Sequence, residues 1–177
     1  MKTWFICHLR AIRRDWQCYA LLTSIWLLAM VRVLIDPTPR LPILFNVTPS
    51  LPYLVAVVDY GARGVGRGDY VIFAFRGDAV RHFPGLRGQP FFKRVAGVAG
   101  DLVEVRERRV FVNGVEAGFA KRFATVSQLA LEPIAVTVIP AGYLYMQGAN
   151  PDSFDSRYML CGLVATSDVL AVVRPLF

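Results

Sequence analysis

The sequence predicts a mainly β domain that follows a single N-terminal transmembrane helix. Two observations lead to this fold class. The first is a nearly uninterrupted apolar stretch of twenty residues, 16–35, close to the start of the chain. The second is the remainder, where short runs rich in Val, Ile, Phe and Tyr alternate with turn residues and no amphipathic helical pattern is evident. With 177 residues the chain accommodates one modest domain and its anchor.

The apolar stretch has the sequence WQCYALLTSIWLLAMVRVLI and one charge, Arg32, near its outer end. At about 1.5 Å per residue a helix of this length just crosses a hydrocarbon core of roughly 30 Å, and an arginine at the boundary reaches the headgroups. A cleaved signal peptide is the alternative, because residues 18–31 are uncharged and have the length of a signal-peptide core. Bulky residues after Val31 offer no small-residue cleavage site, which favours a retained anchor.

The residues that flank this stretch predict its orientation. The charges before it are mostly basic: Lys2, Arg10, Arg13 and Arg14 against Asp15. Basic flanks stay in the cytoplasm, so residues 1–15 are predicted to be a cytoplasmic segment. Prolines in the segment after the helix cannot continue it, so residues 36–44 are predicted to be a linker and 45–177 an extracytoplasmic domain.

Charge and cysteine content exclude several classes of function. The chain carries 20 Lys and Arg against 13 Asp and Glu. This surplus suits an anionic membrane surface, whereas the basic residues are too scattered to predict nucleic-acid binding. Beyond the apolar stretch the chain has one cysteine, Cys161, and one histidine, His82, so a disulfide is not expected and a Ser/His/Asp triad would depend on His82 alone. No cofactor or metal site is predicted.

Eight segments of the outer region have the composition of strands, and Asn113-Gly114 is typical of a two-residue hairpin turn. The predicted strands are Leu54 to Asp59, Tyr70 to Phe75, Phe91 to Val98, Leu102 to Val105, Val110 to Val112, Ile134 to Val138, Tyr143 to Met146 and Val169 to Val173.

One of these strands contains a lysine in an apolar setting. In an extended segment, Phe91, Lys93 and Val95 share one face. Apolar neighbours would desolvate the Lys93 amine and favour the neutral form that a general base requires. The alternative, equally open on spacing alone, is a lysine at a sheet edge with its amine in water. A neutral lysine can activate a serine hydroxyl, and Ser50, about fifteen residues after the apolar stretch, is the candidate nucleophile.

A polar segment near the C-terminus can support this pair. In an extended chain Ser153, Asp155 and Arg157 project to one side. Asp155 and Arg157 would then form an ion pair, which leaves the Ser153 hydroxyl free to hydrogen-bond the Lys93 amine and orient it. The alternative is a solvated loop with an ordinary surface ion pair.

Four blocks of residues resemble those of the type I signal peptidases and, within that family, the conjugative transfer signal peptidases of the TraF type. In chain order they are Asn46-x-Thr48-x-Ser50-x-Pro52, Gly68 to Phe73, Lys93 to Asp101, and Gly148-Ala149-Asn150 with Ser153 to Tyr158. The resemblance covers essentially the whole chain from the apolar stretch onward. It implies an antiparallel β catalytic domain of signal peptidase type and a serine endopeptidase that uses a Ser/Lys dyad.

The resemblance also implies a role for each matching residue. Ser50 is the nucleophile and Lys93 the general base, while the Ser50 N–H and the Thr48 hydroxyl hold the oxyanion. Ser153 positions Lys93, and Asp155 with Arg157 shapes the site.

The implied substrate is a secreted or pilin precursor, processed in conjugative transfer. The enzyme would lie in the bacterial inner membrane with its catalytic domain in the periplasm, and its partners would be the lipid bilayer and other proteins of the transfer apparatus. Release of the acyl-enzyme by water gives hydrolysis, whereas a substrate amine would close a ring, and the residues leave both open.

Ala149 stands where general signal peptidases commonly have an aspartate, which weakens the assignment as a general type I enzyme and leaves it as the alternative to the transfer type. The sequence after Tyr158 departs from the pattern usual in the transfer-type enzymes. Two other classes remain: a non-enzymatic membrane-anchored β scaffold, and a self-cleaving repressor-type Ser/Lys protease, which would need a DNA-binding module where this chain has its apolar stretch.

Overall fold

The computed structural model describes residues 16–35, 43–46, 48, 50–59, 62 and 64–176. Two units, Met1–Arg40 and Leu41–Phe177, are compact in themselves and are described separately. The predicted cytoplasmic segment 1–15 and most of the predicted linker, residues 36–42, lie outside the described residues.

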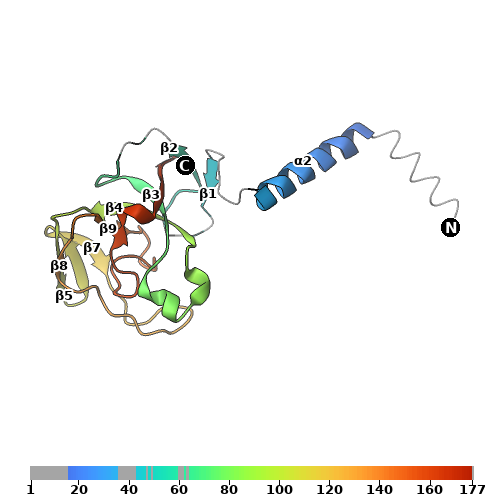
Figure 1. The fold of residues 1–177 in the computed structure, drawn as a ribbon. Helices are drawn as coiled ribbons and strands as arrows, with labels where there is room; N and C mark the ends of the chain where they lie inside the picture. The colour runs from blue at the N-terminus through green and yellow to red at the C-terminus, as the bar shows by residue number, and fades with distance from the viewer. Residues whose placement is uncertain are drawn as a thin grey trace. The chain divides into compact units, whose positions relative to one another are not determined.

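The first unit contains the helix α2, Trp16–Ile35, over the residues that the apolar pattern predicts (Figure 1). Within the part of the chain that the structure describes, no helix combines the length and the apolarity needed to cross a membrane. The helix is therefore confirmed, and its membrane-spanning role is not shown by the structure.

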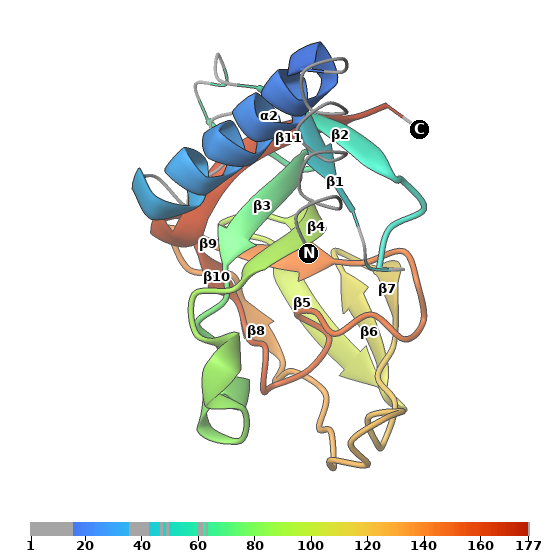
Figure 2. The same cartoon turned by 90° about the vertical axis from the view of Figure 1, so that its right-hand side faces the viewer.

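The second unit is built from two antiparallel sheets (Figures 1 and 2). Seven strands form the larger sheet in the order β1-β2-β11-β3-β4-β9-β10, and four form the smaller one in the order β7-β6-β5-β8. The strands are β1 Ile43–Phe45, β2 Val55–Asp59, β3 Tyr70–Ala74, β4 Pro90–Gly97, β5 Leu102–Arg106, β6 Arg109–Val112, β7 Val115–Phe119, β8 Thr137–Val138, β9 Tyr143–Gln147, β10 Val164–Ala165 and β11 Val169–Pro175. The short 3₁₀ helices are η1 Asp78–Arg81, η2 Pro84–Leu86 and η3 Thr166–Asp168.

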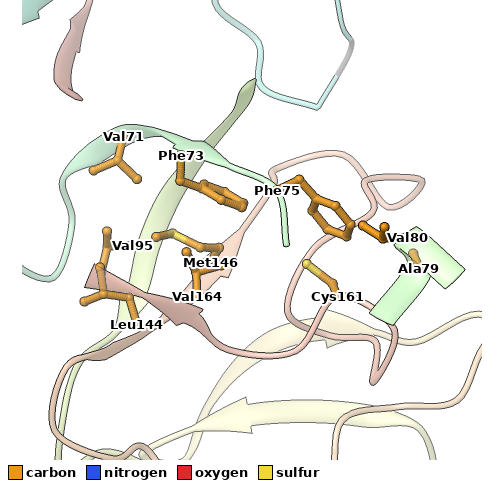
Figure 3. Close-up of a cluster of buried hydrophobic side chains, with 10 residues drawn as sticks. All are labelled: Val71, Phe73, Phe75, Ala79, Val80, Val95, Leu144, Met146, Cys161 and Val164. Atoms are coloured by element: carbon orange, nitrogen blue, oxygen red, sulfur yellow. The ribbon is translucent and has the colours of Figure 1, made fainter. Parts of the chain in front are cut away.

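The larger sheet buries side chains on both of its faces. Alternate residues of β3 face opposite sides. Val71 and Phe73 pack into a cluster with residues of β4, β9 and η1, and Figure 3 shows Phe75 beside Val80 of η1 and near Cys161. Tyr70 and Ile72 pack on the other side, against a smaller cluster from β2 and β11. A sheet covered on both faces explains why its central strands are nearly continuous apolar runs.

The smaller sheet is folded by two tight hairpins. Asn113 and Gly114 have φ angles of 49° and 78°, and Val112 pairs with Val115 across them, which confirms the predicted turn. The preceding turn, at Glu107 and Arg108, also has positive φ angles, of 49° and 66°. Its residues carry no turn signature, so the sequence does not predict it.

The strand predictions were wrong at four places. Three short strands, β1, β7 and β10, are not predicted, and β1 begins inside the predicted linker. β7 contains Glu116, Ala117 and Gly118, which have low strand propensity, and forms because the hairpin turn pairs it with β6. The predicted strand from Ile134 shrinks to Thr137–Val138, because the Ile134 N–H donates instead to the Arg157 carbonyl.

Candidate active site

Lys93 lies in the centre of the larger sheet. It is on β4 opposite Val71 of β3, and its side chain shares a face with Val95, one of the residues of the cluster in Figure 3. Only 3% of Lys93 is exposed, while Arg94 on the opposite face is exposed. The predicted burial of Lys93 is confirmed, and the alternative of a solvated lysine at a sheet edge is excluded.

The environment of Lys93 favours a neutral amine. Burial lowers the pKa of Lys93, and the positive charge of Arg157 acts in the same direction, while the carboxylate of Asp155 opposes both. No hydrogen bond or ion pair joins the amine to another described residue, and Nζ lies 5.6 Å from the centroid of the Phe91 ring. The charged amine loses hydration on burial, and the attraction of the Asp155 carboxylate does not make up for that loss.

Ser50 lies in the loop between β1 and β2, and the side chain of Asn46 organises this loop. Asn46 Oδ1 accepts hydrogen bonds from the Thr48 N–H at 3.1 Å and from the Thr48 hydroxyl at 2.9 Å. Asn46 Nδ2 donates to the carbonyls of Leu51, at 3.3 Å, and Tyr53, at 2.8 Å. One amide thus ties together the two arms of the loop, before and after Ser50. Thr48 is exposed, and its hydroxyl would have to exchange this bond to donate to an oxyanion.

The backbone of Ser50 is held by the segment after β9. The Ser50 carbonyl accepts from the N–H groups of Ala149, at 2.8 Å, and Asn150, at 3.2 Å. A Cβ on Gly148 would lie 3.0 Å from the Ser50 carbonyl oxygen and 2.0 Å from Ser153 Oγ. Only glycine fits there, so position 148 brings the serine loop and Ser153 together.

Asp155 and Arg157 form the predicted ion pair, and it is fully buried. The Asp155 side chain is 0% and the Arg157 side chain 3% exposed, and the two are joined by hydrogen bonds of 2.8 Å and 2.9 Å. Asp155 also accepts from the Gly148 N–H at 2.8 Å, while Arg157 Nη2 donates to the carbonyls of Asn150 and Ser153. The ion pair fixes the backbone at Gly148 and Asn150, on both sides of the Ala149 N–H that binds the Ser50 carbonyl. The alternative of a solvated surface pair is excluded.

The predicted extended conformation of this polar segment was wrong. The Tyr158 N–H donates to the Asp155 carbonyl at 3.1 Å and closes a turn. As a result Ser156 is also fully buried; its Oγ accepts from the Met146 N–H and donates to the Gly162 carbonyl. Ser156 attaches the turn to β9, a role that sequence alternation could not assign.

The predicted hydrogen bond from Ser153 to Lys93 is also absent. Ser153 is 3% exposed, and its Oγ has no hydrogen-bond partner among the described residues. The hydroxyl lies against Gly148 instead, because the turn at Asp155 directs the chain toward β9. Its role as a positioning residue stays a prediction, as do the roles of Ser50, Lys93 and Thr48.

A cavity of about 470 Å³ opens beside the serine loop. Leu51, Pro52 and Tyr53 line one side of it, and it continues over Gly148 and Ala149 to the exposed face of β4. The described residues thus provide a serine loop beside space for an extended polypeptide, a buried lysine on the opposite face of β4, and a buried ion pair that fixes the backbone. A serine and a neutral lysine are the groups that acyl transfer by a Ser/Lys pair requires.

The family model described as signal peptidase, peptidase S26, matches residues 14–177. The chain belongs to the signal peptidase family. This membership confirms the family that the four sequence blocks predict, and it identifies the chain as a protease of signal peptidase type.

The proteins that resemble this member of the signal peptidase family include a relative and a solved structure. The conjugal transfer protein TraF of Agrobacterium fabrum strain C58 is 31% identical over 144 residues, which span 75% of this chain and 80% of the relative. A crystal structure of a signal peptidase I from Enterococcus faecalis V583 matches with a TM-score of 0.42 and 24% identity, over 64% of this chain and 100% of that chain.

Three residues of the candidate site lie in the matched blocks but were assigned no role from the sequence. Asn46 has a recognisable signal, because asparagine two residues before a loop threonine often accepts from the following backbone. Gly148 and Ser156 have none, since their importance depends on which segment packs against them.

Proposed function

We propose that this signal-peptidase-family chain is a serine endopeptidase in which Ser50 is the nucleophile and Lys93 is the general base. One observation carries the proposal: Lys93 is buried, its pKa is lowered by that burial, and no described residue forms an ion pair with its amine. A structural lysine in such a position would be expected to have a carboxylate partner, because an unpaired buried charge is costly. A general base needs the opposite, a neutral amine near the working pH.

In this mechanism Lys93 takes the proton of Ser50 as the hydroxyl attacks the scissile carbonyl. The oxyanion receives hydrogen bonds from the Ser50 N–H and, after it releases Asn46, from the Thr48 hydroxyl. Lys93 then returns the proton to the leaving amine, and water resolves the acyl-enzyme by the same route. A substrate amine that reaches the ester first would close a cyclic product.

The buried ion pair has a positioning role. Asp155 and Arg157 hold the backbone at Gly148 and Asn150, and the neighbouring N–H groups hold the Ser50 carbonyl. Ser153 lies in the same cluster and would orient the Lys93 amine once a substrate has excluded water.

The proposed substrate is a pilin precursor of a conjugative transfer system, in an enzyme anchored by Trp16–Ile35 to the inner membrane with its catalytic domain in the periplasm. The name of the Agrobacterium relative supports the transfer role, and the basic residues before the helix support the orientation. The lipid bilayer and other transfer proteins are the proposed partners. A general signal peptidase would cleave ordinary exported preproteins instead.

The experiment incubates the detergent-solubilised full chain with a pilin precursor and with an unrelated preprotein, and weighs the products. Ser50→Ala, Lys93→Ala and Lys93→Arg should each abolish cleavage, the last because a guanidinium is not deprotonated in proteins. Ser127→Ala, an exposed serine, is the matched control and should cleave normally. Near-normal cleavage by Ser50→Ala or Lys93→Ala contradicts the dyad. Equal cleavage of both substrates favours the general enzyme, and a product one water lighter than the linear chain indicates cyclisation.

Protease protection tests the anchor. In sealed inner-membrane vesicles with the cytoplasmic side inside, added protease should degrade the domain beyond residue 43. A product that begins after Ile35 in untreated membranes, or full protection, would contradict a retained anchor with this orientation.

A further inference from the structure

The face of β4 opposite the Lys93 side chain forms part of the wall of the 470 Å³ cavity. Arg94 and Ala96 line it there, and Leu51 lines it next to Ser50. A substrate that reaches the serine would therefore extend along this wall with side chains a few residues from the scissile bond. The inference that follows rests on the proposed function.

The charges in the cavity wall are not equivalent. Arg67 is paired with Asp101, and Glu116 is paired with Arg109 at 2.7 Å. Arg94 has no carboxylate partner among the described residues, although it is exposed on the cavity side. The cavity therefore presents one positive charge that the protein itself does not neutralise.

Two tyrosines adjoin this arginine. Arg94 is paired in register with Tyr70 on β3, and the Tyr70 ring packs edge-on against Tyr53 with the two hydroxyls 3.2 Å apart. Burial and the Tyr53 hydroxyl raise the pKa of Tyr70, and they outweigh the opposing effect of the neighbouring Arg94, so the Tyr70 hydroxyl keeps its proton over the physiological range. Gln147, the register partner of Arg94 on β9, is fixed by its hydrogen bond to the Ala117 carbonyl at 2.7 Å. The guanidinium of Arg94 and the phenol O–H of Tyr70 are both hydrogen-bond donors. No described carboxylate of the protein accepts from Arg94.

We propose that this cavity binds a carboxylate of the substrate through Arg94 and the Tyr70 hydroxyl, and so selects precursors with an acidic residue close to the cleavage point. A planar guanidinium accepts a carboxylate in a two-point geometry, and the neighbouring phenol adds a third donor. The carboxylate could belong to a Glu or Asp side chain or to the C-terminus of a short leaving segment, and the two sources share the same chemistry. Arg94 is thus a specificity-determining residue for the reaction, while the Lys93 side chain lies on the opposite face of β4.

The test is a scan with fluorescent peptides that share one cleavage site. A single Glu is placed in turn at each of four positions before and four after the scissile bond, and each peptide has a Gln counterpart of the same shape. At one position the full-length enzyme should favour Glu over Gln in kcat/KM by about three- to tenfold, and 0.5 M salt should reduce this ratio. A second series compares a free C-terminal acid with its amide at increasing distance from the cleavage point, which separates the two sources of carboxylate.

Variants of Arg94 assign the preference to this residue. Arg94→Gln should bring the Glu/Gln ratio to about one while cleavage of the Gln peptide persists, and Arg94→Glu should favour a Lys peptide. Arg87→Gln removes the same charge from an exposed site outside the cavity wall and should leave the ratio unchanged. Tyr70→Phe should reduce the ratio in part. Thermal melting of each variant verifies that the exposed substitutions leave the fold intact.

Binding is measured in parallel by fluorescence anisotropy on wild type and on Ser50→Ala, so that the carboxylate preference does not depend on turnover. Cleavage with equal rates for every Glu/Gln and acid/amide pair overturns the carboxylate site and leaves the peptidase proposal standing. Tighter binding of Glu peptides that depends on Arg94, without cleavage of any peptide, supports the carboxylate site and overturns the peptidase. A preference that survives in Arg94→Gln overturns the assignment to Arg94.

Discussion

The two halves of the candidate site are held in place by different means. Lys93 lies on a central strand, and the Asp155–Arg157 pair beside it is buried and bonded to four backbone groups. Ser50 lies in a partly exposed loop that depends on one side chain, Asn46, and on two N–H groups from the segment after β9. The predicted base is thus part of the folding core, and the predicted nucleophile is attached to its edge.

Because of this difference, stability and activity should respond separately to substitutions in the two halves. Substitutions on the Lys93 side act on the core and should change the free energy of unfolding. Substitutions in the serine loop should change the reaction rate far more than the free energy of unfolding, because the loop makes few buried apolar contacts. Five predictions test this separation, in order of decreasing expected size.

Arg157→Met should have the largest effect. It leaves the Asp155 carboxylate buried without its partner, and breaking such a pair costs about 3–5 kcal/mol of unfolding free energy. Chemical denaturation of the detergent-solubilised chain measures this loss. Arg109→Met breaks the exposed pair with Glu116 and should cost less than about 1 kcal/mol. Equal losses in the two variants would mean that the buried pair does not organise the site.

Lys93→Met separates stability from activity within one residue. The variant should be inactive, yet more stable than wild type at neutral pH by about 1–3 kcal/mol, because it replaces a buried amine without a partner by an apolar side chain of similar length. Denaturation curves check the predicted gain in stability, and peptide turnover on the same samples checks the predicted loss of activity. A destabilised Lys93→Met would show that the amine has a structural partner.

The pH dependence of Lys93 has a definite sign. Because burial lowers the pKa of folded Lys93 below its ordinary value of 10.5, the unfolded chain binds the extra proton between the two pKa values. The lysine contribution to stability therefore rises with pH across that window, and the advantage of Lys93→Met should shrink as pH approaches 10.5. In wild type, kcat/KM should rise with pH through the same lowered pKa. A pH-independent rate in an assay limited by chemistry would count against lysine as the base.

The sequence predicted those features that depend on local patterns. Period-two alternation placed Lys93 among apolar neighbours, and the Asn-Gly pair placed the hairpin after β6, since both depend only on residues close in the chain. The turn at Asp155 could not be predicted in the same way. Its conformation depends on Ser156 bonding to β9, ten residues earlier in the chain, and no local preference encodes that contact. The turn at Glu107 and Arg108 is similar: the Arg108 side chain donates to the carbonyls of Ala120 and Lys121, contacts that form only in the folded domain.

Asn46→Ala tests the edge of the site. The variant loses the hydrogen bonds that tie Thr48 to Leu51 and Tyr53, so Ser50 should sample more conformations. We expect kcat/KM to fall about tenfold, which corresponds to about 1.4 kcal/mol, while the melting temperature changes little. Asn113→Ala removes an asparagine from a hairpin outside the serine loop and serves as the control, with normal turnover expected. A large loss of stability in Asn46→Ala would place the serine loop within the core and remove the distinction between the two halves.

Ser153→Ala should have the smallest effect, and the two readouts should move in opposite directions. The Ser153 hydroxyl is buried without a partner among the described residues, so its removal relieves a desolvation cost and should leave stability unchanged or raise it by up to about 1 kcal/mol. If the hydroxyl orients the Lys93 amine only when substrate is bound, kcat should fall a few-fold while KM stays the same. Single-turnover rates across pH measure this, and the apparent pKa of the rate should rise when the orienting hydroxyl is lost, because a less restrained amine is more easily hydrated and protonated.

Ser153→Thr offers a hydroxyl in a larger side chain, but the closeness of Gly148 leaves it no room, so it should be less stable than Ser153→Ala. An unchanged rate and pH profile in Ser153→Ala would mean that the residue only packs against Gly148, and that Lys93 is positioned by β4 and the Asp155–Arg157 pair alone.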